Sequence, residues 1–341
     1  MRPSVAINVL RDMILARENV LLVGNPGVGK TDISEQATKL CIHTDGLPYD
    51  FGVMHPVISD PTDFKGMPFV IDGFPEWRPF GDLRALIEAE RPLVMLLDDL
   101  GQANQSVQGA AMQLLWAKRI GDFHVSPHVR FLAATNPKGR GMGVTGILEP
   151  VLGRFSAVLE IQPNVDDWVQ WANQNNMPSE VIAWVSDSPQ DSILAKYEPA
   201  TGIHNSPNPR TVAALGRVFN LSIPEDVRYE VYSGAVGKGS ATSFIAYVDS
   251  VQRMPSLDGI LLNPDTMPVP NNDLSVMYAI MAGLAVRATR ENIHAIGVYL
   301  SRVTRKELSV FCMKGATDRD KELRKTATFV RWAQENQYLF Q

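Results

Sequence analysis

Residues 21–40, LLVGNPGVGKTDISEQATKL, decide the fold because they predict three elements in immediate succession. Residues 20–23 form a short apolar stretch that is typical of a buried strand. Residues 31–42 have helical spacing, and a turn rich in glycine separates them from the strand. Within this turn, GNPGVGKT fits the pattern G-x-x-x-x-G-K-[ST].

This pattern is typical of a loop that binds the phosphates of a nucleotide. Glycines let backbone N–H groups turn towards phosphate oxygens, and the positive end of the following helix adds to the attraction. Lys30 is expected to reach the β- and γ-phosphates, and Thr31 to bind Mg²⁺. A turn with a purely structural role is the alternative, which the strand before it and the helix after it disfavour. The expected nucleotide contacts are Gly24, Asn25, Pro26, Gly27, Val28, Gly29, Lys30, Thr31 and Asp32.

A second apolar run, RPLVMLLDD at residues 91–99, ends in two carboxylates. A phosphate-bound Mg²⁺ needs an acidic residue at the end of a neighbouring strand, and this run is expected to supply it. Asp98 would hold the metal through water, and Asp99 lies where a general base polarises the attacking water. Either residue alone has a common alternative role as a helix N-cap, which the nearby phosphate-loop pattern makes less attractive.

Strands alternate with helices through the first half of the chain, and helices fill the second half. This order predicts an α/β fold with a mostly parallel sheet, followed by a helical region. A hairpin with the turn Asp72-Gly73 interrupts the first half. GAVGKGSAT (234–242) does not fit the phosphate-loop pattern, since its lysine precedes the last glycine, and it is expected to join two helices. Further strands are expected at residues 49–54, 129–135 and 157–161, and helices at 105–118, 165–176, 179–185, 208–221, 225–236 and 240–253.

The composition is that of a soluble globular protein, with 45% hydrophobic and 20% charged residues among 341. The net charge of −5 argues against a protein whose main role is to coat nucleic acid. Cys41 and Cys312 show no metal-ligand spacing, so reduced thiols in a cytoplasmic protein are expected. No apolar run reaches the roughly 18–20 residues that span a bilayer, so no membrane insertion is expected.

Several motifs taken together resemble the AAA+ ATPases, specifically their MoxR-like branch. They are GNPGVGKT, the stretch from LLDDLGQANQ to FLAATNP, LEPVLGRF and SPNPRTVAALGRV, and the resemblance covers about residues 20–222. The segment SDPTDFKGMPF (59–69) and the hairpin after it resemble an insertion of that branch. The resemblance implies a P-loop core with a parallel five-stranded sheet at residues 1–162. It further implies a helical lid at 163–222 and a helical C-terminal region at 223–341.

The family pattern implies roles for three further residues. Asn136, at the end of the strand beside the phosphate-loop strand, would be sensor 1 and orient the attacking water. Arg154 in LGRF matches the arginine finger, which reaches the nucleotide of a neighbouring subunit, and Arg140 is its nearest competitor. Arg210 in NPRT matches sensor 2, in the lid. The plain alternatives are a surface salt bridge for Arg154 and a helix-start arginine without a ligand for Arg210.

The resemblance also implies ATP and Mg²⁺ as cofactors and a ring of subunits, commonly a hexamer, that remodels or activates a partner protein. MoxR-like members often act with a separate protein that carries a von Willebrand factor type A domain. The family usually has glutamate where this chain has Asp99, so slower hydrolysis is expected here.

Two other functions stay open at this stage. One is an AAA+ motor that acts on nucleic acid, to which the basic residues between Ser301 and Thr326 point. The other is a nucleotide-gated scaffold with slow hydrolysis. For the hairpin, Phe69, Phe74 and Trp77 either face a pore or partner, or pack the hairpin onto the sheet.

Overall fold

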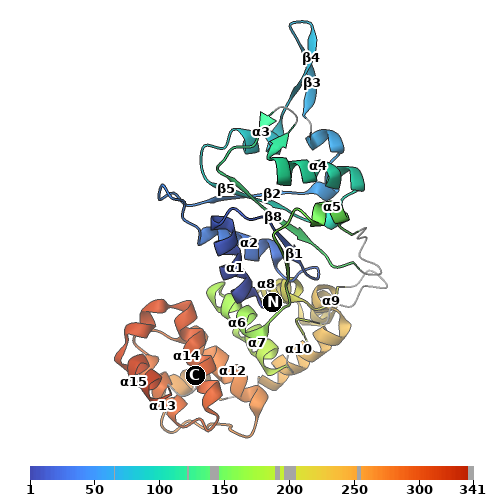
Figure 1. Ribbon diagram of the computed structural model, residues 1–341. Helices are drawn as coiled ribbons and strands as arrows, with labels where there is room; N and C mark the ends of the chain where they lie inside the picture. The colour runs from blue at the N-terminus through green and yellow to red at the C-terminus, as the bar shows by residue number, and fades with distance from the viewer. Residues whose placement is uncertain are drawn as a thin grey trace. The chain divides into compact units, whose positions relative to one another are not determined.

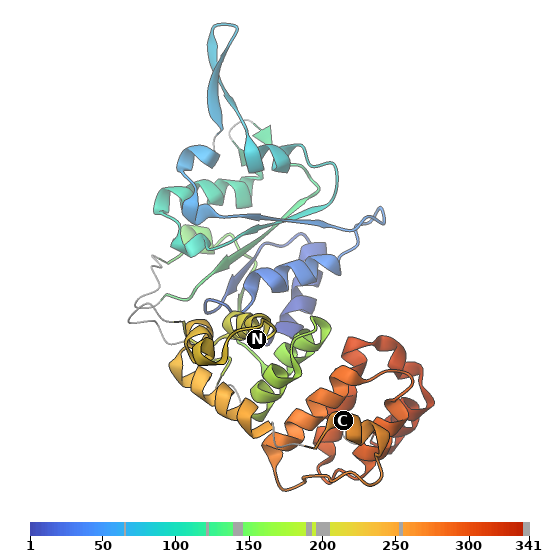
Figure 2. The same ribbon diagram turned by 180° about the vertical axis from the view of Figure 1, so that it is seen from behind.

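The computed structural model describes residues 1–64, 66–120, 123–138, 146–188, 193–195, 205–251 and 255–336. The chain forms two compact units, Met1–Gln162 and Pro163–Gln341. The first unit contains the α/β part and the second is helical (Figures 1 and 2). The fold class expected from the sequence is therefore confirmed.

A parallel five-stranded sheet forms the centre of the described part of the first unit, in the order β2-β5-β8-β1-β9. Its strands are β1 (Val20–Val23), β2 (Asp50–Met54), β5 (Leu93–Leu97), β8 (Val129–Thr135) and β9 (Ala157–Glu160). All five were expected at these places in the sequence. One expected neighbour is wrong, because β5 pairs with β2 and β8 and not with the phosphate-loop strand β1.

Helices cover both faces of this sheet (Figures 1 and 2). Successive residues of a strand point to opposite faces, so Leu21 joins the core beneath α3 and α4, and Leu22 joins the core beneath α1 and α2. Adjacent β8 divides in the same way, with Phe131 on the first face and Leu132 on the second. The strands read as continuous apolar runs for this reason. The helices are α1 (Pro3–Leu15), α2 (Lys30–Lys39), α3 (Gly81–Ile87), α4 (Gln105–Ala117) and α5 (Glu149–Leu152), with short 3₁₀ turns η1 (Pro56–Ile58), η2 (Pro61–Phe64) and η3 (Leu100–Gln102).

The expected hairpin is present as β3 (Met67–Ile71) and β4 (Phe74–Arg78), which pair antiparallel. Asp72 and Gly73 both have positive φ, 52° and 83°, as a two-residue hairpin turn requires. In Figure 1 the hairpin projects away from the sheet. Because Phe69, Phe74 and Trp77 are about half exposed or more, the interpretation in which these rings pack onto the sheet is wrong. A second short hairpin comprises β6 (Arg119–Ile120) and β7 (Phe123–His124).

Two hydrophobic cores hold the helical second unit together. One joins α6–α10 to α12 and includes Trp184 and Phe244, whose rings meet edge to face. The other joins α11–α15, with Tyr299 fully buried in it. The segment GAVGKGSAT joins α9 to α10 at Gly237, as expected. The helices are α6 (Val165–Gln174), α7 (Ser179–Asp187), α8 (Pro209–Phe219), α9 (Glu225–Val236), α10 (Lys238–Val251), α11 (Leu257–Leu262), α12 (Leu274–Arg287), α13 (Ile293–Ser301), α14 (Lys306–Arg319), η4 (Lys321–Lys325) and α15 (Ala327–Glu335).

The two cysteines, Cys41 and Cys312, are buried free thiols, as expected. Burial raises the pKa of Cys41 to about 11 and that of Cys312 to about 12. Both are therefore protonated near neutral pH and poor nucleophiles. Within the described ranges, no helix is both long and apolar enough to cross a membrane.

Candidate nucleotide-binding site

Strands β1, β5 and β8 end at one edge of the sheet. The phosphate loop follows β1, Asp98 and Asp99 follow β5, and Asn136 follows β8. Val23 of β1 lies opposite Thr135 of β8, so the phosphate-loop residue Gly24 and Asn136 leave the sheet side by side. The Gly24 N–H donates to the Thr135 carbonyl over 3.2 Å, which extends this pairing. Asp98 follows β5 in the same way on the other side of β8. In open parallel sheets this edge is where ligands bind.

The glycines of the loop are required by its backbone. Gly27 and Gly29 have φ of 78° and 98°, values that side chains with a Cβ rarely adopt. A Cβ on Gly24 would lie 2.9 Å from the Ile161 carbonyl oxygen, closer than real contacts allow. The loop then leads directly into α2, which begins at Lys30. Its first N–H groups and its positive end are thus directed at the position that the loop encloses.

Lys30 is buried and its ammonium group is held from two sides. Nζ donates to the Gly24 carbonyl over 2.8 Å and to Asn136 Oδ1 over 2.8 Å. These two hydrogen bonds hold the positive charge of Lys30 close to the loop, in a position to attract phosphate oxygens. The lysine and Asn136, 106 residues apart in sequence, therefore belong to one site.

Thr31 and Asp98 supply two oxygen atoms at one point. Thr31 Oγ1 donates to Asp98 Oδ2 over 2.9 Å, and Asp98 is only partly buried. A hydroxyl and a carboxylate in contact beside a phosphate loop fit Mg²⁺, which binds through one or two protein oxygens and keeps several waters. Two other polar residues belong to the expected set. Asn25 is partly buried in the loop, and Asp32 lies exposed on the first turn of α2.

Asp99 adopts a left-handed backbone conformation, with φ 55° and ψ 32°. This conformation is uncommon for a residue other than glycine and is found at functional sites more often than elsewhere. Its carboxylate faces Asn136, whose Nδ2 lies 3.5 Å from Asp99 Oδ1, at the limit of a hydrogen bond. The two residues are thus neighbours across β5 and β8.

The sequence analysis did not identify Gln102, which lies beside both Asp99 and Asn136. It ends the 3₁₀ turn η3, and its backbone N–H donates to the Asp99 carbonyl over 2.9 Å. The only signal in the sequence is an amide side chain three positions after a strand-end carboxylate, which is too common to identify a site.

Arg154 lies in the turn after α5, and its guanidinium group packs on Trp116 of α4. The distance from Cζ to the ring centroid is 4.7 Å, and the Trp116 side chain is 68% exposed. Asn19 Nδ2 donates to the carbonyl oxygens of Leu115 and Arg154, which ties this turn to the end of α4. Within the ranges that the structure describes, the buried Nε of Arg154 has no hydrogen-bond partner. The competing Arg140 lies outside the described residues.

Arg210 lies in the second unit, at the second residue of α8, and is exposed. Asn208 caps this helix in a reciprocal pair with Thr211, which holds the first turn in a defined conformation. The role that the resemblance implies for Arg210 stays a prediction.

Comparison with known proteins agrees with this geometry. Residues 19–155 match the family described as AAA domain (dynein-related subfamily). Among curated proteins, none matches the sequence.

Two solved structures illustrate the range of similar folds. NtrX from Brucella abortus in complex with ADP is 11% identical, with a TM-score of 0.42 over 98% of this chain and 67% of that chain. The RuvB Holliday junction branch migration motor of Thermotoga maritima is 16% identical, with a TM-score of 0.39 over 82% of each chain. The sheet order, the phosphate loop and the family match to residues 19–155 together show that the first unit has the AAA+ P-loop fold.

Proposed function

We propose that this protein is a MoxR-like AAA+ ATPase, which hydrolyses ATP with Mg²⁺ in a ring of subunits to remodel or activate a partner protein. The observation that carries the proposal is the meeting of three pairs of groups at one sheet edge. Lys30 contacts Asn136, Thr31 contacts Asp98, and Asp99 faces Asn136. A structural glycine turn requires none of these contacts.

Each group has a distinct part in this chemistry. Lys30 and the loop N–H groups bind the phosphates and oppose the charge that develops on the γ-phosphoryl oxygens. Thr31 and Asp98 would hold Mg²⁺, which neutralises phosphate charge when bound. Asp99 accepts a hydrogen bond from the attacking water, and Asn136 orients that water. Because aspartate is one methylene shorter than glutamate, we expect slow rather than fast turnover.

The proposed ring rests on Arg154, which would complete the nucleotide site of a neighbouring subunit. Arg154 is partly exposed and packs on the exposed ring of Trp116, so this pair can contact a neighbouring subunit. A guanidinium supplied by a neighbour contributes roughly 10³–10⁵ to the rate in enzymes of this kind. Residues 163–222 would act as the lid, with Arg210 as sensor 2, and residues 223–341 as a separate helical region. A hexamer is the expected ring size.

The hairpin β3–β4 is the proposed contact with the partner. Val70 and Phe74 near its tip are 77% and 73% exposed, an unusual position for apolar side chains. A protein with a von Willebrand factor type A domain is the expected partner.

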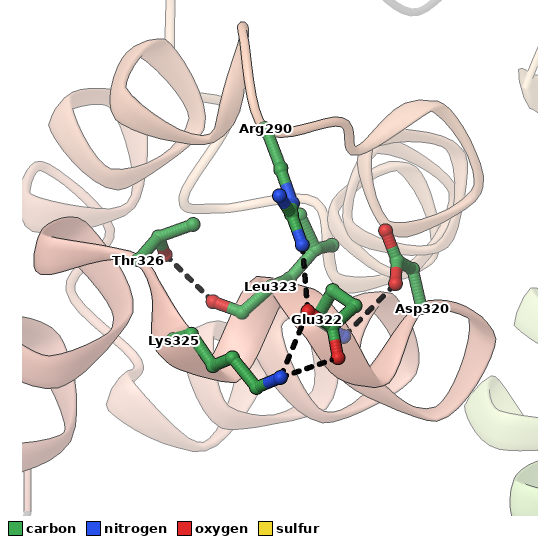
Figure 3. A network of polar contacts seen from close by, with 6 residues as sticks. All are labelled: Arg290, Asp320, Glu322, Leu323, Lys325 and Thr326. Carbon is green, nitrogen blue, oxygen red and sulfur yellow. Dashed lines mark hydrogen bonds and ion pairs between the residues drawn. The ribbon is translucent and has the colours of Figure 1, made fainter.

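The alternative function on nucleic acid receives little support from the basic C-terminal helices. Glu322 accepts hydrogen bonds from Arg290 and Lys325, each over 2.7 Å, and Asp320 caps the same turn (Figure 3). Arg324 is within 3.6 Å of Asp318. Part of the positive charge is therefore already neutralised within the protein, which leaves less of it for phosphates.

ATP turnover by the full chain tests the proposal. We expect wild type to hydrolyse ATP in the presence of Mg²⁺, and Lys30→Ala to lose both nucleotide binding and turnover. Asp99→Asn should keep nucleotide binding and lose turnover, because the amide cannot accept a proton. Lys238→Ala is the matched control, since Lys238 also follows a glycine but lies exposed at the start of α10.

Other results would select other functions. If wild type turns over no faster than Lys30→Ala yet assembles with ATP, the protein is a nucleotide-gated scaffold. If nucleic acid stimulates turnover in a salt-dependent manner, a motor on nucleic acid replaces the remodelling of a partner. Affinity purification with ATP and Mg²⁺ then identifies the partner directly.

A further inference from the structure

Gln102 is held against the catalytic edge of the sheet by the turn that precedes it. The left-handed conformation of Asp99 turns the chain back after β5, and η3 follows at once. Gly101 lies against the end of β8, where a Cβ would come within 2.3 Å of Thr135 Oγ1. This close approach brings the next side chain, Gln102, beside Asn136, which follows Thr135.

The Gln102 carboxamide bridges the two residues that would act on water. In the amide orientation that satisfies both neighbours, its nitrogen donates to Asp99 Oδ1 over 2.6 Å and to Oδ2 over 3.1 Å, and its oxygen accepts from Asn136 Nδ2 over 2.6 Å. The reverse amide orientation would place its oxygen against the carboxylate and its NH₂ group against that of Asn136, so it is disfavoured. The direct contact between Asn136 and Asp99 is longer, at 3.5 Å, so Gln102 is the stronger link.

These contacts extend a chain of hydrogen bonds that begins at the phosphate loop. Lys30 donates to Asn136, Asn136 donates to Gln102, and Gln102 donates to Asp99. Every donor in this chain meets an acceptor, which is the condition under which such a network holds its members in one geometry.

We infer that Gln102 is a positioning residue for the reaction, which holds the Asp99 carboxylate in one orientation beside Asn136. A general base must lie within hydrogen-bond reach of the water that it activates, and donation to both carboxylate oxygens restrains the Asp99 side chain in that place. The inference rests on the proposed ATPase function, and it adds a residue that the resemblance did not assign.

Three variants test the inference. Gln102→Leu removes both hydrogen bonds at similar volume. Gln102→Glu keeps the shape and, when ionised, replaces the donor by a second negative charge. Gln113→Leu is the control, since Gln113 lies exposed on the neighbouring helix α4. For each protein we would measure thermal unfolding, ATP affinity and kcat.

We expect both Gln102 variants to bind ATP within about threefold of wild type and to lose at least about tenfold in kcat. The loss should fall on kcat and leave ATP affinity in place, because Gln102 orients the groups that act on water and does not contact the phosphate loop. A residue with only a packing role would lower stability and ATP affinity together with kcat. Gln113→Leu should match wild type throughout.

The outcomes separate the inference from the function on which it rests. If wild type is no faster than Lys30→Ala, the ATPase proposal fails and the role of Gln102 fails with it. If wild type is active and the Gln102 variants keep its kcat, or lose kcat only together with ATP affinity and stability, the inference alone is overturned. Should Gln102→Leu unfold, the isosteric Gln102→Glu still decides the question.

Discussion

Gly101 lies at the closest approach between the turn after β5 and the end of β8. The approach leaves no room for a Cβ, which would be 2.3 Å from Thr135 Oγ1 and 3.2 Å from Ile147 Cγ1. Since Asp99 and Gln102 lie on either side of this position and Asn136 follows Thr135, the geometry of the site depends on one missing methyl group.

We therefore expect Gly101→Ala to lower the free energy of unfolding by about 1–3 kcal/mol and to reduce ATP turnover, since the turn must move away from β8. Gly109→Ala is the matched control in α4, where a Cβ meets nothing within 4 Å and the helix should gain about 0.5–1 kcal/mol. Chemical denaturation of both variants checks the difference. A Gly101→Ala protein as stable and active as wild type would contradict this account of the turn.

Lys118 directly follows the C-terminal end of α4, and burial of its side chain lowers its pKa. Its Nζ lies 4.5 Å from the Phe131 ring centroid and donates to Asn19 Oδ1 over 3.1 Å. Burial, together with the nearby positive charge of Arg130, lowers the pKa of Lys118 to about 8. Asn19 in turn holds the Arg154 carbonyl, so this lysine is part of the support of the Arg154 turn.

The lowered pKa predicts how stability changes with pH. The pKa of Lys118 is about 8 in the native state and about 10.4 in the unfolded chain. Between these two pH values the unfolded chain therefore binds more protons than the native state. Unfolding free energy should therefore rise with pH in this window, relative to Lys118→Met, by about 2–3 kcal/mol. Urea denaturation of both proteins at pH 7 and pH 10 measures the change. An equal difference at the two values would show that Lys118 does not titrate in this window.

At the scale of elements, the sheet and the hairpin β3–β4 differ in whether their apolar side chains are buried. Strands β1 and β8 have both faces buried, with alternate residues in two cores. The hairpin has the same kind of apolar residues and yet leaves them in solvent. Stability therefore depends on the sheet, and the hairpin is free to serve another purpose.

The Val70→Ser, Phe74→Ser double variant should show this division. We expect its unfolding free energy to change by less than about 0.5 kcal/mol and its ATP turnover to match wild type, while ATP-dependent capture of the partner is lost. Leu86→Ala in the fully buried side of α3 is the contrast, with an expected loss of about 2–5 kcal/mol. Thermal unfolding, turnover and affinity purification report the three quantities. A double variant that still captures the partner would remove the hairpin from the interface.

At the scale of the whole molecule, the proposed site needs groups from two subunits. Lys30, Asp98 and Asp99 come from one chain, whereas Arg154 would act on the nucleotide of a neighbour. Mixing two inactive variants tests whether Arg154 acts on the nucleotide of a neighbouring subunit.

Lys30→Ala and Arg154→Ala should each be inactive alone and regain activity when mixed. In an equimolar random ring, about a quarter of the sites combine an intact Lys30 with a neighbour's Arg154, so up to about a quarter of wild-type turnover is expected. A mixture of Lys30→Ala with Asp99→Asn is the control, and it should stay inactive because both residues serve the same site. Absence of recovery in the first mixture would place Arg154 outside the neighbouring site.

Much of the site could be predicted from the sequence alone. The phosphate loop is a local structure, since a strand, a turn with glycine at positions of positive φ and a helix follow one another within twenty residues. The two carboxylates after β5 could be predicted because strand ends in a parallel sheet share one edge, whereas the role of Asn136 after β8 came from the resemblance to the AAA+ family. The turn of the hairpin depends likewise on two adjacent residues.

Other features were decided only by the tertiary structure, because they depend on how distant segments approach one another. The sequence placed the carboxylate strand beside β1, but β8 lies between them. The exposure of the hairpin and the stacking of Arg154 on Trp116 depend on what the rest of the chain leaves uncovered. The bridge formed by Gln102 exists because Gly101 packs on Thr135. Short-range backbone chemistry thus determined the conformation of the phosphate-loop motif, and long-range packing decided which side chains lie around it.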